Sequence, residues 1–570
     1  MSYRGFFGTS LAKLPSKKAL ALVLGVLVLF FAMFVLRSFG ELGDLGIFRI
    51  TGFPTTQNYL LVFQNDAERR PTGGFITAYG ILRFRFGVPF LDFGNVYDPK
   101  LVQKGEQFPD STIDSLIGGP LFPGHGFRDG NFDPDFPTTA EELIRLYRLG
   151  YPKAKFDGVI AIDFTAFENL AKKITPEIIG KTGLFSQIEN RVQNIDLHNP
   201  DQLLERKNFL SGFAKKLIRQ IVFVPPKYSA AAKSILNSLR EKHILLYFHD
   251  TKLQQIVREK NWAGELPFVA DSDFLAINEG NYGGMKSSRY LTRDIFYDIE
   301  FTEAEDGSFV PLANLRIILA HRGDTAEPIS GYYKSFWRIY TPLGSTLTAG
   351  EIDRGFDDTR RQIFGKIVAM NPDETREINL QYKLPLSVFS DGIYRLRLIK
   401  QAGSSTDHIR VTVKLPLGFE TVSDEFDARE NLAIFETNLK SDENLALKIF
   451  PDTIPPRLAW QNFVGGIQKI NLRFNEHLEE SSILPENFLL NDADFRNQRT
   501  DAVSISRVQF VPPQNILLEL QGVSEECREW YSLQFSGVAD RHGNSIPDTK
   551  VTVVQWLDIA GENCDPENLL

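Results

Sequence analysis

The chain has 570 residues, which is too long for one hydrophobic core and suggests about three or four domains. Its 43% hydrophobic and 24% charged residues are ordinary for globular proteins and exclude wholesale disorder. A net charge of −9 argues against binding to nucleic acid, so we expect no such partner. Two cysteines, Cys527 and Cys564, are too few for a four-cysteine zinc site, and their spacing leaves open whether they form a disulfide.

Residues 19–36 form an apolar run of 18 residues, which as a helix measures about 27 Å, close to the thickness of the bilayer core. Residues 1–18 contain several basic side chains and no acidic one, so the positive-inside rule places them in the cytoplasm. The alternative is a cleaved signal peptide, but the run is longer than a signal core and a poor cleavage site follows it. We therefore expect a single-pass anchor in the cytoplasmic membrane, with the rest of the chain outside.

Residues 45–288 alternate between strand and helix patterns and predict an α/β domain. Strands are expected at 59–63, 75–86, 156–162 and 244–248, and helices at 138–150, 163–174, 203–222, 229–242 and 251–260. Thr138 and Glu141 have the spacing of a capping box at a helix start. Four phenylalanines near the second strand, at positions 84, 86, 90 and 93, are expected in the core; the alternative is a groove for a lipid tail or a sugar.

From Arg289 onward the pattern changes to strands with almost no helix. Residues 289–452 therefore predict a β-sandwich domain. The pair Pro455-Pro456 marks the next boundary, and residues 453–558 predict a third, all-β domain with an Ig-like sandwich. Residues 559–570 remain as a tail.

Residues 59–75, which read YLLVFQNDAERRPTGGF, resemble the signature of a bacterial family known as domain of unknown function 4012. The similarity continues at 133–137, 156–163, 206–210, 281–288 and 400–403, and so spans about residues 59–418. The third domain resembles the Ig-like modules of bacterial surface-layer proteins, through residues 471–476 and 537–544.

A second resemblance concerns residues 157–174, which look like a strand–helix segment of the LytR–CpsA–Psr family. Members of that family transfer glycopolymers from a lipid diphosphate to peptidoglycan. The resemblance implies a similar α/β fold and places residues 206–210 where the family has an arginine-rich helix facing the diphosphate. The Ser-x-Pro-Arg-Asp pattern of the family does not occur here, so the catalytic pattern is incomplete and the catalytic residues stay unknown.

A diphosphate site needs arginine forks and, usually, carboxylates that hold Mg²⁺. The candidates for ligand contact are Arg69, Arg70, Gly73, Gly74, Arg128, Arg206 and Lys207, and those for the metal are Asp129, Asp133 and Asp135. Each has a structural alternative: the arginines pair with neighbouring carboxylates, the aspartates cap turns, and the glycines satisfy the backbone.

Two functions follow from these observations. The first is a membrane-anchored envelope protein that scaffolds or binds wall polymers without turnover. The alternative is a phosphotransferase that attaches lipid-diphosphate-linked glycopolymers to the cell wall. The test is whether Arg70, Arg128, Asp129, Asp135 and Arg206 converge on one cleft. Convergence of three basic side chains with a carboxylate would favour the enzyme, and dispersal would favour the scaffold.

Overall fold

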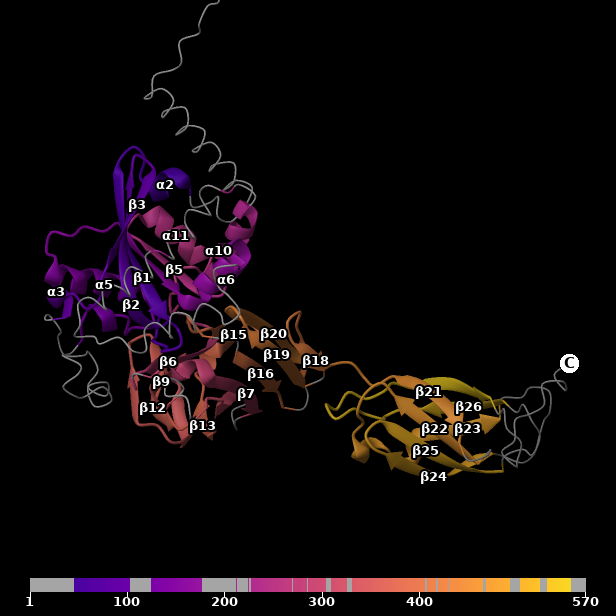
Figure 1. Ribbon diagram of the computed structural model, residues 1–570. Coiled ribbons are helices and arrows are strands. Elements are labelled where there is room, and N and C mark those ends of the chain that lie inside the picture. Colours follow the sequence, from indigo (N-terminus) through magenta and orange to yellow (C-terminus); the bar gives the residue numbers. More distant parts are fainter. Residues whose placement is uncertain are drawn as a thin grey trace, which may run out of the picture.

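The computed structural model describes residues 46–102, 125–176, 212, 224, 227–268, 270–283, 285–303, 309–324, 331–404, 407–416, 419–429, 431–464, 468–492, 503–522 and 530–554. These residues form an α/β domain, a large β-sandwich packed against it, and a separate third domain (Figure 1). The predicted anchor at 19–36 lies outside them, as do the predicted helix at 203–222 and both cysteines. Among the described helices, none is long and apolar enough to cross a membrane.

The α/β domain is built on a five-stranded sheet with the order β3-β2-β1-β4-β5. Its strands are β1 (Thr56–Asn65), β2 (Phe75–Arg85), β3 (Val88–Gly94), β4 (Gly158–Asp163) and β5 (Ile244–Phe248). Strands β1 and β4 run parallel, whereas the other neighbouring pairs are antiparallel. The strands expected at 59–63, 75–86, 156–162 and 244–248 correspond to β1, β2, β4 and β5, and the sheet is mixed.

Helices cover both faces of this sheet because alternate residues of β1 point to opposite sides. On one face, α5 (Phe136–Gly150) buries Leu143 against Leu60 and Val62 of β1. On the other face, α10 (Tyr228–Arg240) and α11 (Thr251–Glu259) pack with Tyr59. Three further helices are α2 (Ile47–Thr51), α3 (Pro99–Val102) and α6 (Phe164–Ile174).

The starts of α5 and α6 differ in how well the sequence predicted them. Helix α6 begins within one residue of the expected start at 163, and Asp163 caps it by accepting a hydrogen bond from the backbone N–H of Ala166 at 2.8 Å. Helix α5 begins earlier than expected, because its cap is Asp135 rather than Thr138. The Asp135 carboxylate accepts hydrogen bonds from both the backbone N–H and the hydroxyl of Thr138, at 3.1 and 2.7 Å. The predicted capping box was therefore wrong by one helical turn.

The sandwich consists of a seven-stranded sheet with the order β10-β13-β8-β7-β16-β19-β18 and a sheet with the order β11-β12-β9-β6-β15-β20-β17. Its strands are β6 (Asp273–Asn281), β7 (Leu291–Glu303), β8 (Phe309–His321), β9 (Tyr333–Pro342), β10 (Thr346–Gly350), β11 (Arg354–Asp357), β12 (Arg361–Met370), β13 (Thr375–Lys383), β14 (Phe389–Ser390), β15 (Ile393–Ile399), β16 (Asp407–Lys414), β17 (Phe419–Val422), β18 (Asp427–Arg429), β19 (Leu432–Leu439) and β20 (Glu443–Pro451). The inner faces enclose a core that includes Trp337, Tyr297 and Tyr394.

One strand of the sandwich lies before its predicted start at Arg289. Strand β6 pairs with β9 and β15, so the sandwich already begins at Asp273 and the α/β domain ends earlier than the predicted residue 288. Every residue of β6 is buried, although several are polar, such as Asn278, Glu279 and Asn281. A buried polar strand shows no regular hydrophobic pattern, which is why the sequence assigned this segment to the wrong domain.

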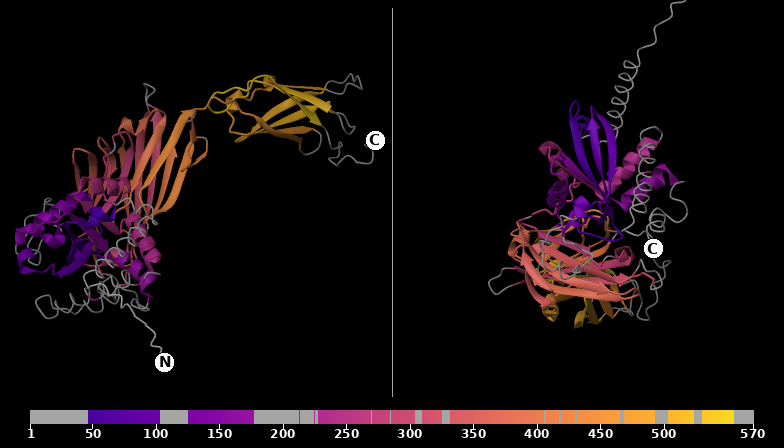
Figure 2. Two further views of the ribbon diagram at one scale, coloured as in Figure 1. Left: turned by 90° about the horizontal axis from the view of Figure 1, so that it is seen from above. Right: turned by 60° about the vertical axis from the view of Figure 1, so that its left-hand side comes forward.

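The third domain packs two smaller sheets, β21-β22-β25-β24 and β23-β26-β27. The strands are β21 (Leu458–Phe463), β22 (Lys469–Phe474), β23 (Phe488–Asp492), β24 (Ser504–Val511), β25 (Asn515–Gln521), β26 (Trp530–Phe535) and β27 (Thr549–Val554). The strands that flank Pro455-Pro456, β20 and β21, belong to different sheets. The third domain therefore projects from the sandwich on a short connection (Figure 2).

Candidate functional site

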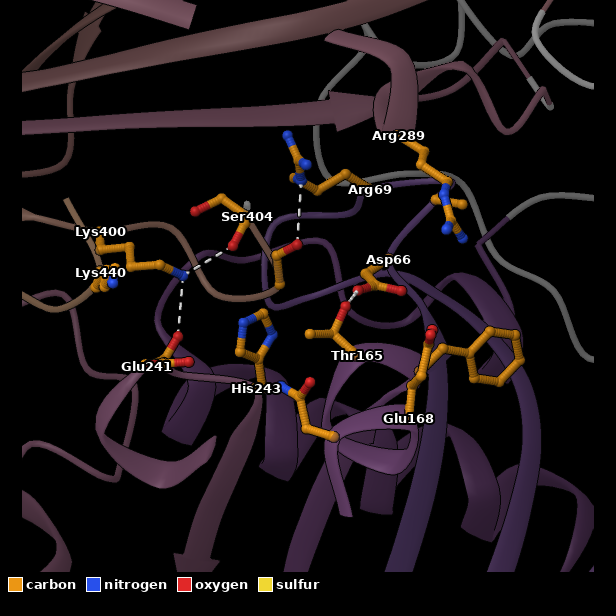
Figure 3. Close-up of a pocket in the computed structure, with 14 residues that line it drawn as sticks. Asp66, Arg69, Thr165, Glu168, Glu241, His243, Arg289, Lys400, Ser404 and Lys440 are labelled. Carbon is orange, nitrogen blue, oxygen red and sulfur yellow. Dashed lines mark hydrogen bonds between the residues drawn. The ribbon is translucent and has the colours of Figure 1, made fainter. Parts of the chain in front are cut away.

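A cavity of about 430 Å³ lies between the α/β domain and the sandwich (Figure 3). It opens at the carboxyl ends of β1 and β4, because Asp66 follows β1 and Asp163 ends β4 in a parallel pair. His243 comes immediately before β5, the antiparallel neighbour of β4, and so reaches the same edge. In α/β sheets, ligands commonly bind at the carboxyl ends of strands.

Asp66 and His243 line this cavity, and buried Asp163 lies directly behind them. One ligand atom of each lies within 4.8 Å of the others, which is the spacing of a metal-binding group. His243 Nδ1 is 2.6 Å from Asp163 Oδ2, and Asp66 accepts a hydrogen bond from the Thr165 hydroxyl. Burial, together with the charge of Asp163, raises the pKa of Asp66 to about 6. The imidazole is thus paired with Asp163, whereas Asp66 accepts its hydrogen bond from a hydroxyl.

Cationic side chains complete the cavity. Lys400, just after β15, donates hydrogen bonds from Nζ to the backbone carbonyls of Glu241 and Ser404, at 2.9 and 3.0 Å. Burial lowers the pKa of Lys400 to about 8. Arg289 and Lys440 are exposed where they line the opening. The cavity therefore offers groups of both charges to a polar ligand.

Arg69 lines the same cavity, but its guanidinium is engaged in contacts with other residues of the protein. It forms a buried ion pair with Glu279 of β6, and Nε donates to the carbonyl of Gly403 at 3.4 Å. Its backbone N–H donates to the Ser288 hydroxyl at 3.3 Å. Arg69 thus connects the α/β domain to the sandwich.

Arg70 points into a second group of buried charges. Its Nη2 lies 3.1 Å from Glu68 and 3.5 Å from Asp129, and the guanidinium is 4.4 Å from the ring centre of Tyr282. Arg128 joins the group through Asp129, at 3.1 Å. The structure therefore brings Arg70, Arg128 and Asp129 together, but in a buried ion cluster rather than an open cleft. The reason is that loop 66–74 inserts against the sandwich, where Thr72 bridges to Ala402.

The predicted glycines allow this insertion. Gly73 has φ +134°, which favours glycine, and a Cβ on Gly74 would lie 2.2 Å from the backbone of Asn65. Asn131 also donates a hydrogen bond to the Gly74 carbonyl at 2.7 Å. These contacts favour the backbone role over ligand contact.

The three predicted metal ligands do not meet. Asp135 caps α5 with one oxygen and accepts the backbone N–H of Leu266 with the other, at 2.9 Å. Asp133 accepts the backbone N–H of Asp135 at 2.8 Å, and Asp129 pairs with arginines. Asp133 and Asp135 thus act as caps and Asp129 as an ion-pair partner, which are the structural alternatives. Arg206 and Lys207 lie outside the described residues.

Two residues of this site, Asp66 and Asp163, have a position in the sequence that could have predicted them, although they were not among the candidates. Asp163 is the last residue of a buried strand, and Asp66 directly follows another. The carboxyl ends of neighbouring parallel strands meet at one edge of a sheet. His243 stands alone in the sequence, and Lys400 is far from both aspartates along the chain. Only the pairing of β1, β4 and β5 brings them together.

Two solved structures match this chain with low similarity. The N-terminal part of the bacterial S-layer protein SbsC matches with 12% identity and a TM-score of 0.16, covering 18% of this chain and 24% of its own. A protein from Legionella pneumophila described as nutrient-binding matches with 9% identity and a TM-score of 0.21, covering 28% of this chain and 67% of its own. These scores are too low to show a common fold.

No curated protein matches the chain. The family match and these two structures do not show the expected LytR–CpsA–Psr similarity, which stays a prediction. The family resemblance is confirmed over a shorter range than expected, and residues 55–185 match the family described as protein of unknown function (DUF4012).

Proposed function

We propose that this protein is a membrane-anchored scaffold of the bacterial cell envelope that binds a wall polymer without turning it over. The observation that carries the proposal is the cavity at the carboxyl ends of β1 and β4. Its cationic rim, formed by Arg289 and Lys440, suits an anionic polymer, and its carboxylates suit hydroxyl donors.

The buried ion pairs of Arg69 and Arg70 favour binding over turnover. A transferase acting on a lipid diphosphate needs guanidinium groups that are free to stabilise phosphate charge. Arg69 and Arg70 are instead engaged in buried ion pairs with Glu279, Glu68 and Asp129. Opening either pair for a ligand would leave a carboxylate buried without its partner.

A phosphotransferase is the second candidate, because one observation favours it. The group Asp66, Asp163 and His243 has the donor atoms and the spacing to hold a divalent cation. A cation there would have to replace the hydrogen bond between Asp163 and His243. We therefore keep Mg²⁺ as a proposed cofactor of this alternative only, with Asp66 and Asp163 as its oxygen ligands.

Co-sedimentation of the detergent-solubilised full chain with purified insoluble cell walls tests the proposal. We expect the parent protein to sediment with the walls, and the double variant Arg289→Glu, Lys440→Glu to lose at least tenfold in affinity. Lys550→Glu is the control, since this exposed residue of the third domain lies far from the cavity. Equal binding by the double variant and the parent would contradict the proposed site.

A transfer assay distinguishes the two candidates. The full chain is incubated with a lipid-diphosphate glycopolymer, cell walls and Mg²⁺, and wall-linked polymer is measured. The scaffold proposal predicts binding without transfer. Transfer that is lost in Asp66→Asn would establish the enzyme instead.

A further inference from the structure

The hairpin formed by β2 and β3 ends in an exposed aromatic tip. Phe86, Val88 and Phe90 have exposed fractions of 72%, 54% and 50%. Phe86 and Gly87 form the two-residue turn, with φ of +49° and +79°. Phenylalanine is rare at positive φ, where asparagine or glycine is normal. The large apolar side chain of Phe86 in this turn therefore costs conformational free energy of the backbone.

This tip corrects the expectation that all four phenylalanines of the hairpin lie in the core. Phe84 packs edge-on against Tyr59 at 6.2 Å, and Phe93 stacks on Phe63 at 5.7 Å. Phe86 and Phe90 do not share this environment, because the hairpin extends beyond the sheet. Its outer part therefore presents apolar surface that the described fold leaves in solvent.

The tip lies at the end of the sheet where the chain enters. Thr56, the first residue of β1, pairs with Arg85, so the Phe86-Gly87 turn lies just beyond the start of β1. Phe53, which is 45% exposed, belongs to the turn between α2 and β1. Figure 1 shows α2 and the end of this hairpin together, at the edge of the domain away from the sandwich.

The distance along the chain keeps this edge near the predicted anchor. Nine residues separate position 36, where the apolar run ends, from Gly46, where the described structure begins. Fully extended, this connection reaches at most roughly 35 Å. An aromatic tip with the exposed cation of Arg85 beside it has the composition of a surface that enters a lipid interface.

We propose that the tip of the β2–β3 hairpin inserts into the outer leaflet of the membrane that holds the anchor. Phe86, Val88 and Phe90 enter the interfacial layer, and Arg85 contacts lipid phosphate. The inference rests on the membrane anchor of the proposed function and adds an orientation to it. Strand β1 has ten residues, about 33 Å, and the cavity lies at its other end, so the cavity faces away from the bilayer toward the wall.

Quenching by brominated lipids tests the insertion. Phe86→Trp is made in the full chain, reconstituted into vesicles of phosphatidylcholine and phosphatidylglycerol, and compared with the same vesicles containing dibrominated acyl chains. The signal of the parent protein, which has five tryptophans, is subtracted. We expect the added tryptophan to lose at least half of its fluorescence. Leu489→Trp, at a position 54% exposed in the third domain, is the control and should lose none.

Flotation of the vesicles separates failure of the anchor from failure of the hairpin. A chain that does not float with vesicles overturns the anchor, and with it both the proposed location and the hairpin contact. A chain that floats while Phe86→Trp stays unquenched overturns the hairpin contact alone. Blue-shifted but unquenched emission would assign the tip to a second copy of the chain and would equally overturn the lipid contact. A matching melting curve shows that the variant is folded.

Discussion

The two interdomain junctions of this protein are built differently. The α/β domain meets the sandwich through buried charges: Arg69 pairs with Glu279, and Lys242 with Asp442 at 2.7 Å. The sandwich meets the third domain through one such pair, between Asp452 and His542, beside which lies Asp540. Asn544 also donates a hydrogen bond to the backbone carbonyl of Asp452 at 3.0 Å. Removing one partner of a buried ion pair leaves an uncompensated charge. With two such pairs against one, the first junction is expected to hold its domains more firmly than the second.

The largest effect is expected from Glu279→Ala, which removes the partner of Arg69 at the first junction. Leaving a buried guanidinium unpaired should lower the free energy of unfolding by about 3–5 kcal/mol. Chemical denaturation of the full chain measures this loss. The control is Glu436→Ala, which removes an exposed contact to His408 and should cost less than about 1 kcal/mol. Equal losses for the two variants would mean that the buried pair does not stabilise the junction.

Gly74→Ala, in loop 66–74, should lower the free energy of unfolding by a smaller amount. The new Cβ would lie 2.2 Å from backbone atoms of Asn65, so the loop must shift, at a cost of about 1–3 kcal/mol. Gly543→Ala is the control for adding a methyl group, since nothing lies within 4 Å of its Cβ position, although its φ of +87° adds some strain. Melting temperatures of both variants check this. A larger loss for Gly543→Ala would contradict the close approach at Gly74.

The cavity should also make stability depend on pH through Asp66. Because its pKa is raised from 3.8 to about 6, the folded state holds the proton more tightly, and stability falls as the pH rises from about 4 to 6. Asp66→Asn removes this loss. We expect the variant to gain about 2 kcal/mol relative to the parent between pH 4 and pH 7. Urea melts at both pH values measure the gain, and a difference that does not change with pH would contradict it.

The smallest effect is expected at the second junction. His542→Ala removes the contact to Asp452 and should cost about 1 kcal/mol, confined to the third domain. Calorimetry should show a lower melting temperature for one transition only. A shift of every transition would show that the third domain is coupled to the rest as tightly as the α/β domain is.

The buried charges of the first junction also explain which strands could be predicted from the sequence and which could not. Strands with regular apolar patterns, such as β4 and β5, were placed within two residues of their bounds. Strand β6 was assigned to the wrong domain because Glu279 finds its partner Arg69 210 residues away. A hydrophobic pattern reports only what the local chain buries, so pairs between distant charges leave no trace in it.

The residues of the candidate site are likewise brought together by contacts between distant parts of the chain. The sequence singled out Arg69 and Arg70 as ligand candidates, but in the structure both guanidinium groups form buried ion pairs, with Glu279 and Glu68. Asp66 and Asp163 adjoin strands, so their meeting depends on β1 and β4 being parallel neighbours. His243 and Lys400 join them through pairing and domain contact, which no local pattern reveals.

Hydrogen–deuterium exchange of the full chain, with and without a soluble wall-polymer fragment, tests most directly that the cavity between the rigidly joined domains is the binding site. The account predicts slower exchange on binding in residues 66–69, 163–169 and 400–404, all of which include cavity-lining residues. It predicts no change in the third domain. Slower exchange confined to residues 458–554, with none around the cavity, would contradict it.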